Sequence, residues 1–320
     1  MSVRQRLFDG NSSHKHALTH QKRQVIQRFH EGRVKPHTFH KLDPSDLCDA
    51  RQSLWSRKRS HARHGTMLNT VSYPGPDGQT PALIVHGLFG SARNWGVIAK
   101  KLSATRPVLA VDMRNHGDSF RAATNSYADM ADDLADVIRA HGGKAQIIGH
   151  SMGGKAAMQL ALTRPELVEK LVVADIAPVT YTHTQTPLID AMAALDVTTL
   201  KTRRDADNAL ATSIPETGVR AFLLQSLDMR ADPPSWKLNL PVLRAEMPKI
   251  IGWPGTQGTY NADTLILSGG ASEYVTEAHR PLFDTHFPNA RHHVIPSVGH
   301  WLHAEAPTPF LEALTAFLNL

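Results

Sequence analysis

The sequence of 320 residues predicts an α/β fold, in which a mainly parallel sheet is flanked by helices and carries one inserted helical segment. Three observations predict this class. From about residue 70 onward, short apolar segments of strand type alternate with amphipathic segments of helix type. Between residues 179 and 258 this alternation stops and prolines become frequent. From residue 264 the alternation resumes.

The first half of the predicted core is a strand-like opening after Met67 and then four buried strands with helices between them. The four strands are expected at residues 82–86 (ALIVH), 107–112 (PVLAVD), 145–148 (AQII) and 170–174 (KLVVA). The helices are expected at residues 95–103, 127–141 and 155–163. Because open α/β sheets bind ligands at the carboxyl ends of their strands, each strand end is a candidate site.

The second half contains the predicted insertion and the return to the core. Residues 179–258 contain helical stretches with Leu and Met, interrupted by seven prolines. This pattern favours a helical lid over a continuation of the sheet. A strand at 264–267 (TLIL), a helix at 276–287, a strand at 292–295 and a helix at 309–318 follow. The predicted domains are therefore a core of residues 67–178 and 259–320 and a lid of residues 179–258.

The positive charge is concentrated at the N-terminus. Residues 1–66 hold 14 Lys and Arg against 5 Asp and Glu, whereas the rest of the chain holds 21 against 24. This basic arm shows no sustained apolar periodicity, so we expect it to be disordered. Three interpretations stay open: a tail for nucleic acid or a membrane surface, an organelle-targeting segment, or a native start at Met67. We favour the start at Met67.

Composition excludes several classes of protein. Cys48 is the only cysteine, which excludes an intramolecular disulfide framework and a CxxC metal site. No run of about 18 apolar residues is present, so we expect no stable membrane insertion. We expect a cytoplasmic protein, or a mitochondrial one if the arm is a targeting segment.

A candidate nucleophile lies in the segment GHSMGG, residues 149–154, between the AQII strand and a helix. This is the G-x-S-x-G elbow in the context that it requires. The turn is so tight that side chains two positions before and after Ser151 would clash, which explains Gly149 and Gly153. The same turn presents the serine hydroxyl above the sheet.

A serine needs a base to accept its proton. The sequence offers 19 histidines, and position selects His300, which follows the last strand in the segment SVGHW. His303 is interpreted as a helix-entry or packing residue, and His292 and His293 belong to the strand.

The histidine needs a carboxylate partner. After the TLIL strand, where this acid most often lies, Ser272 occupies the expected position and Glu273 is one residue away. Asp175 stands instead at the end of the strand before the insertion. We favour Asp175 and keep Glu273 as the alternative.

Acyl transfer also needs backbone N–H donors for the oxyanion. We expect these from Met152, directly after the nucleophile, and from Leu88 in the segment HGLFG. Asp112 and His116 follow the second strand and are interpreted as residues that brace a loop.

Five segments in order resemble the α/β-hydrolase fold superfamily: HGLFGSARNWG (86–96), VDMRNHGDS (111–119), GHSMGGKAAM (149–158), ADIAP (174–178) and GHWLHAE (299–305). More narrowly, the chain resembles the YbfF-type acyl esterases and the mitochondrial abhydrolase-domain group. The resemblance covers residues 68–319. It implies a helical lid and an acid after the strand that follows the elbow helix, which is Asp175 here. The compact bacterial members lack the N-terminal arm.

The expected function is a serine esterase that cleaves acyl esters of short to medium chain through Ser151, His300 and Asp175, with an acyl-enzyme intermediate and neither metal nor organic cofactor. The expected partner is a small-molecule ester and not a nucleic acid, and the protein is expected to be a monomer or a small homo-oligomer. Thioesterase, lipase-like, perhydrolase and carbon–carbon bond hydrolase activities stay open, as does a catalytically silent binding protein. Eight apolar residues of the insertion are candidates for the acyl pocket: Leu188, Met192, Leu195, Phe222, Leu223, Met229, Trp236 and Trp253.

Overall fold

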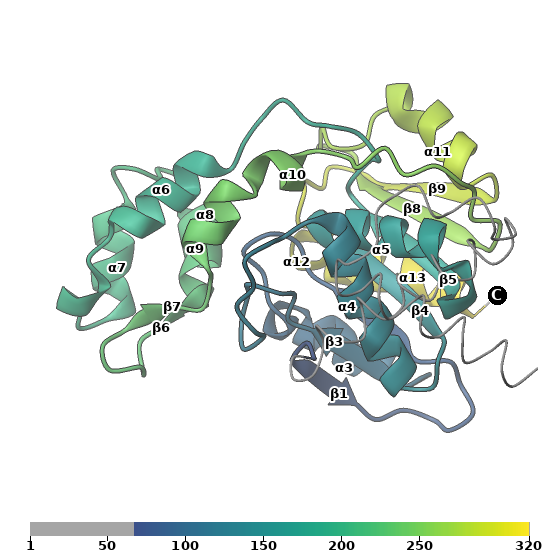
Figure 1. Cartoon of the computed structure of the whole chain (residues 1–320), viewed down its shortest axis with the longest axis horizontal. Helices are drawn as coiled ribbons and strands as arrows, with labels where there is room; N and C mark the ends of the chain where they lie inside the picture. The colour runs from purple at the N-terminus through teal and green to yellow at the C-terminus, as the bar shows by residue number, and fades with distance from the viewer. Residues whose placement is uncertain (1–66, 320) are drawn as a thin grey trace, which may run out of the picture. The chain divides into compact units, whose positions relative to one another are not determined.

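The computed structural model describes residues 67–319, so the predictions made for residues 1–66 lie outside the described residues. Its centre is a seven-stranded sheet with the strand order β1-β3-β2-β4-β5-β8-β9 (Figure 1). Every neighbouring pair in this sheet is parallel except β1 with β3. The predicted class, an α/β fold with a mainly parallel sheet, is confirmed.

The strands agree with the sequence pattern to within two residues at each end. They are β1 (Thr70–Tyr73), β2 (Ala82–Val85), β3 (Val108–Val111), β4 (Ala145–His150), β5 (Val168–Ala174), β8 (Thr264–Gly269) and β9 (Ala290–Ile295). All residues of β2, β3 and β4 are buried, because helices cover both faces of the sheet at its centre. The antiparallel pairing of β1 was not predicted, since a short edge strand carries no signal for the direction of its partner.

Helices cover the two faces of the sheet and form two apolar clusters with it. One cluster contains residues of α4 (Tyr127–Ala140), α5 (Met152–Thr163) and α11 (Arg280–His286). The other contains residues of α3 (Gly96–Leu102), α12 (Leu302–Glu305) and α13 (Pro307–Leu318). Short 3-10 helices lie at Ala92–Trp95, Pro165–Leu167 and Glu277–His279, and the last of these replaces the start of the helix predicted at 276–287.

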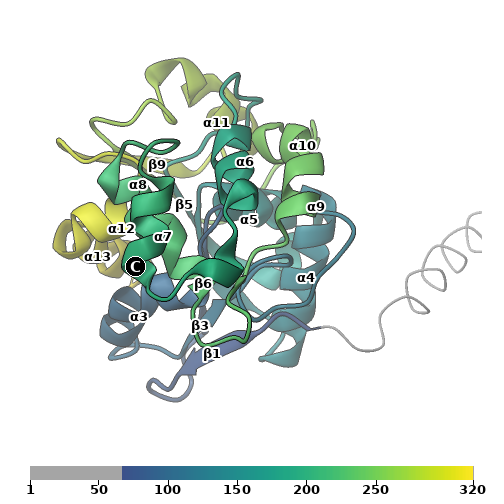
Figure 2. The ribbon, with the colours of Figure 1, turned by 90° about the vertical axis from the view of Figure 1, so that its left-hand side faces the viewer.

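The segment between β5 and β8 contains helices and a second, two-stranded sheet (Figure 1). The helices are α6 (Thr186–Ala194), α7 (Arg203–Leu210), α8 (Thr217–Leu223), α9 (Leu240–Ala245) and α10 (Met247–Ile251), with 3-10 turns at Val197–Thr199 and Leu224–Ser226. The strands β6 (Leu227–Asp228) and β7 (Ser235–Trp236) are antiparallel, and two-residue strands leave no periodic pattern to predict. We call residues 179–258 the insertion. In the view from the side of the insertion, its helices lie in front of the central sheet (Figure 2).

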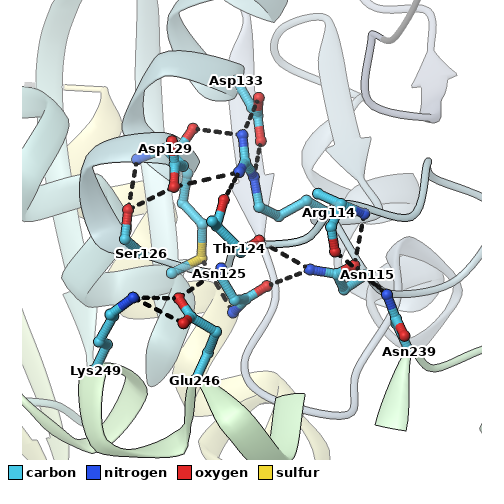
Figure 3. A network of polar contacts seen from close by, with 12 residues as sticks. Arg114, Asn115, Thr124, Asn125, Ser126, Asp129, Asp133, Asn239, Glu246 and Lys249 are labelled. Atoms are coloured by element: carbon cyan, nitrogen blue, oxygen red, sulfur yellow. Dashed lines mark hydrogen bonds and ion pairs between the residues drawn. The ribbon is translucent and has the colours of Figure 1, made fainter. Parts of the chain in front are cut away.

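A polar network attaches the loop after β3 to α4 and to the insertion (Figure 3). The guanidinium of Arg114 pairs with the buried carboxylate of Asp133 on α4 at 2.6 Å. The amide of Asn239 donates to the side chain of Asn115 at 2.9 Å, and the backbone N–H of Asn125 donates to Glu246 at 3.1 Å. One side of the insertion is therefore fixed to the core by directional bonds.

Within residues 67–319, every helix is too short or too polar to cross a membrane.

Candidate active site

Ser151 lies on the sharp turn between β4 and α5. Its backbone φ is 52°, a conformation that a non-glycine residue adopts only when its surroundings enforce it. A Cβ at Gly149 would lie 2.5 Å from the carbonyl oxygen of Gly153, and a Cβ at Gly153 would lie 2.4 Å from that of Val85. The two glycines therefore permit the turn that directs the serine hydroxyl away from the sheet.

His300 lies between Ser151 and Asp175 at the carboxyl edge of the sheet. Its Nε2 is 3.0 Å from the hydroxyl of Ser151, and its Nδ1 is 2.7 Å from Oδ2 of Asp175. Asp175 follows β5, is fully buried and also has a positive φ, of 51°. Because a carboxylate only accepts hydrogen bonds, Nδ1 carries a proton and a neutral His300 has Nε2 free to accept the serine proton. The structure thus brings together the three residues that the sequence nominated from separate loops.

The alternative acid, Glu273, is exposed and is not brought to His300. Its neighbour Ser272 instead donates its hydroxyl to Oδ2 of Asp175 at 2.5 Å, and the backbone N–H of Gly269 donates to Oδ1 at 3.0 Å. The Asp175 carboxylate therefore accepts from Gly269, Ser272 and His300. The sequence marked position 272 as the usual place of the acid, but it did not indicate that a serine there would contact an acid from another strand.

Two aromatic rings hold His300 from the sides. Tyr274 stacks on its imidazole with a centroid separation of 3.9 Å, and the Tyr274 hydroxyl lies 2.9 Å from Nε2 of His183. The Nε2 of buried His150 lies 2.8 Å from the carbonyl oxygen of His300 and donates to it. Burial lowers the pKa of His150, with further lowering from His300 and His303. Sequence reasoning missed these contacts because they join residues far apart in the chain.

Leu88 and Met152 lie beside Ser151, where the oxyanion donors were expected. Both line the same cavity as the serine, and neither backbone N–H has an acceptor among residues 67–319. The loop that carries Leu88 is tightened by a bond from the Gly90 N–H to the Gly87 carbonyl at 3.0 Å. Two unpaired N–H groups beside a serine hydroxyl are suited to a developing negative charge.

The cavity above Ser151 has a volume of about 300 Å³ and is lined mainly by apolar and aromatic side chains. Of the eight candidates from the insertion, Leu188, Phe222 and Leu223 line it. The remaining five, Met192, Leu195, Met229, Trp236 and Trp253, belong to or pack against the apolar cluster that contains α4 and α5. Residues not singled out from the sequence also line the cavity, among them Tyr127, Ile176, Tyr181, Val219, Ile250 and Ile251.

The polar residues that were interpreted as structural make bracing and packing contacts. The Asp112 carboxylate accepts the N–H groups of Ala92 at 2.7 Å and Asp118 at 2.9 Å, which are loop-bracing contacts. His116 is buried, and burial lowers its pKa to about 3. His303 stacks on Trp95 at 4.0 Å, and burial lowers its pKa to about 4. His292 and His293 belong to β9.

A buried cation, Lys155, lies on the first turn of α5 and was not singled out from the sequence. It lines the cavity and is 1% exposed. Its Nζ donates to the carbonyl oxygens of Val179, Ile251 and Gly252 at 2.7, 3.0 and 2.6 Å. Burial lowers its pKa to about 7. An ammonium has three N–H donors, so none is left for a ligand.

Comparison with known proteins places this chain in one family. Residues 80–307 match the family described as the alpha/beta hydrolase fold. The chain is 40% identical over 252 residues to the sn-1-specific diacylglycerol lipase ABHD11 of Mus musculus, with 76% of this chain and 82% of that protein covered. It is 41% identical over 242 residues to the esterase YbfF of Escherichia coli (strain K12), with 75% and 93% covered.

Among solved structures, a marine microorganism esterase superposes with a TM-score of 0.75 at 35% identity, and the match covers 79% of this chain and all of that one. The chain therefore belongs to the α/β hydrolase fold family, as its motifs implied. Within that family it is a hydrolase of the esterase and lipase type.

Proposed function

We propose that this protein is a serine esterase that cleaves small acyl esters of short to medium chain. The observation that carries the proposal is the hydrogen-bonded series from Ser151 through His300 to Asp175 at the base of an apolar cavity. In this proposal Ser151 is the nucleophile, His300 the base, and Asp175 the acid that orients it. The named activities of the relatives, an esterase and a diacylglycerol lipase, support ester chemistry.

In the first half of the reaction, the Ser151 oxygen attacks the ester carbonyl carbon while Nε2 of His300 accepts the hydroxyl proton. The carbonyl oxygen gains negative charge and takes hydrogen bonds from the N–H groups of Leu88 and Met152. Asp175 stabilises the imidazolium through Nδ1. His300 then protonates the departing alkoxide, which leaves as the alcohol, and the acyl group stays on Ser151.

In the second half, His300 takes a proton from water, and the resulting hydroxyl attacks the acyl-serine carbonyl. Collapse of this intermediate releases the carboxylic acid, and the proton on His300 returns to the Ser151 oxygen. The enzyme is then back in its starting state, because His300 has given up both of the protons that it accepted.

The cavity supports the proposed acyl chain length. Its volume of about 300 Å³ is at the small end of the range of roughly 300–1,000 Å³ for ligand pockets. Leu188, Val219 and Phe222 of the insertion form part of its wall. We therefore assign residues 179–258 the role of a lid that supplies the acyl-binding surface.

A panel of p-nitrophenyl esters from acetyl to dodecanoyl tests the proposal. The wild-type protein is expected to prefer short and medium chains, and Ser151→Ala is expected to lower kcat by about 10⁶-fold because the nucleophile is lost. Ser103→Ala, which changes a serine at the end of α3 outside the cavity, is the control and should retain full activity. Turnover that survives Ser151→Ala would exclude the serine mechanism.

A further inference from the structure

Lys155 connects the helix that begins beside the nucleophile to both ends of the insertion. Val179 belongs to the first end, and Ile251 and Gly252 belong to the last end, yet one ammonium donates to all three carbonyl oxygens. The chain between these ends includes all the helices of the insertion. A single side chain on α5 is therefore bonded both where the insertion leaves the core and where it returns.

Further bonds join the same two ends to each other. The carbonyl oxygen of Ile251 also accepts the N–H of Tyr181 at 3.0 Å, and the N–H of Trp253 donates to the hydroxyl of Thr180 at 3.2 Å. Lys155 lies over the ring of Tyr181, with Nζ 4.7 Å from its centroid. The two ends thus form one unit that is bonded together and held on Lys155.

This unit forms part of the cavity wall. Tyr181, Ile250 and Ile251 line the cavity together with Lys155 itself. The hydroxyl of Tyr127 on α4 also donates to the Ile250 carbonyl oxygen at 2.5 Å. The position of this wall relative to Ser151 therefore depends on bonds to α5 and α4, and Lys155 supplies three of them.

Burial and hydrogen bonding act on Lys155 in opposite directions. Burial disfavours the ammonium and lowers its pKa to about 7, whereas three carbonyl oxygens and the face of Tyr181 favour the charged form. Replacing Lys155 by an apolar residue would remove the cost of burying the charge, but it would leave the carbonyl oxygens of Val179 and Gly252 without this donor. Its three directional bonds define the positions of the chain ends that they join.

We propose that Lys155 is a positioning residue that holds the two ends of the insertion against the nucleophile helix and thereby sets which acyl chain lengths the cavity accepts. This inference rests on the proposed esterase function. The substrate class concerned is uncharged acyl esters long enough to reach the wall formed by Tyr181, Ile250 and Ile251. Lys155 has no N–H left to contact the ester itself.

The test compares Lys155→Met with Lys249→Met in the full-length chain. Met matches the four-atom apolar stem of lysine and lacks the ammonium, and Lys249 is an exposed residue of α10 that pairs with Glu246. For Lys155→Met we expect KM for a hexanoyl ester to rise about tenfold, with a smaller rise for an acetyl ester, because the longer chain contacts the displaced wall. Lys249→Met should leave both values unchanged. If KM of Lys155→Met changed equally for all acyl chain lengths, or did not change, the proposal would be overturned.

Hydrogen exchange provides a readout that does not depend on catalysis. In Lys155→Met, peptides that contain residues 179–182 and 250–254 should exchange at least tenfold faster than in the wild type, while peptides of α4 stay unchanged. Unchanged exchange at both ends would contradict the proposal even if activity fell. If wild-type protein cleaved no ester, the proposed function would fail, and the exchange result would still decide whether Lys155 holds the insertion.

Failure of Lys155→Met to fold would still leave a decisive measurement. In the wild-type protein, both ends of the insertion should exchange as slowly as α5, because they share the bonds of Lys155. Exchange of either end at the rate of the exposed helix α7 would overturn the proposal.

Discussion

Asp175 shows how a single residue acquires a chemical role from its place in the fold. It follows β5 with a φ of 51°, and its carboxylate accepts from Gly269, Ser272 and His300. Such strained backbone costs on the order of 1–3 kcal/mol and persists only when the surroundings enforce it. The buried β strands on either side and the three hydrogen bonds supply that enforcement.

Replacing Asp175 by Asn should lower kcat by about 10⁴-fold while leaving the protein folded. The amide nitrogen cannot accept from Nδ1 of His300, so the imidazole is no longer held in the tautomer that the reaction needs. Steady-state kinetics on a butanoyl ester measures this effect. Glu273→Gln is the matched control. Because Glu273 is exposed, kcat of this variant should differ from the wild-type value by less than twofold. A large loss in Glu273→Gln with full activity in Asp175→Asn would reverse the assignment.

The sequence was enough to predict the three residues of the site but not the side chains that surround them. Ser151 and His300 were selected by position relative to predicted strands, and Asp175 by its place at a strand end. The stacking of Tyr274 on His300 and the bond from Ser272 to Asp175 depend on loops from different strands. No local pattern records which loop faces which, so these contacts could not be predicted.

At the scale of elements, the junction of β4 and α5 is packed so closely that neighbouring backbone atoms occupy the space that a side chain at Gly149 or Gly153 would need. A Cβ at Gly153 would lie 2.4 Å from the carbonyl oxygen of Val85 and 2.5 Å from that of His86. A Cβ at Gly154 would likewise lie 2.6 Å from Cγ2 of Ile176. Helix α5 therefore begins in direct contact with β2 and with the segment after β5.

Gly153→Ala should destabilise the protein by about 1–3 kcal/mol, because β2 or α5 must move to admit the methyl group. Esterase activity should fall as well, since Met152 and Ser151 move with the helix. Gly218→Ala is the control: it lies within α8 with open space around it, and alanine should stabilise that helix by up to about 1 kcal/mol. Urea unfolding measures both changes. Equal stability of the two variants would contradict this account of the junction.

The elements of the core were more predictable than those of the insertion for a physical reason. Strands such as β2 and β4 are buried on both faces and appear as continuous apolar runs. Helices α7 and α8 are seven or eight residues long and bury few residues each, so their pattern is weak. The direction of β1 depends on its pairing with β3, a contact that joins separate parts of the chain.

At the scale of the whole molecule, several histidines are buried in uncharged form. Burial lowers the pKa values of His86, His116, His150 and His303, to about 3 for His116 and about 4 for His303. In the unfolded chain a histidine has a pKa of about 6.5. At a pH between the folded and unfolded pKa values of such a histidine, its imidazole is protonated in the unfolded chain and neutral in the folded chain.

Stability should therefore fall as the pH is lowered from about 6.5 toward 4, by up to about 1.4 kcal/mol per pH unit for each of His116 and His303, and His86 and His150 should add to the loss in the same direction. Urea unfolding at pH 6.5, 5.5 and 4.5 measures the slope. His116→Gln removes one of these groups, so its slope should be smaller by about that amount, while the carboxylates contribute equally to both proteins. Parallel slopes for the variant and the wild type would show that His116 does not contribute.

The attachment of the insertion also limits how this protein can be recombined with its relatives. Core side chains that bond to residues 179–258 include Lys155 on α5, Tyr127 on α4 and Asn115 in the loop after β3. A chimera that transplants these residues alone would carry the carbonyl oxygens and amides but leave their partners behind. The unit that can be exchanged between hydrolases is therefore the insertion together with the core side chains that bond to it, among them Lys155, Tyr127 and Asn115.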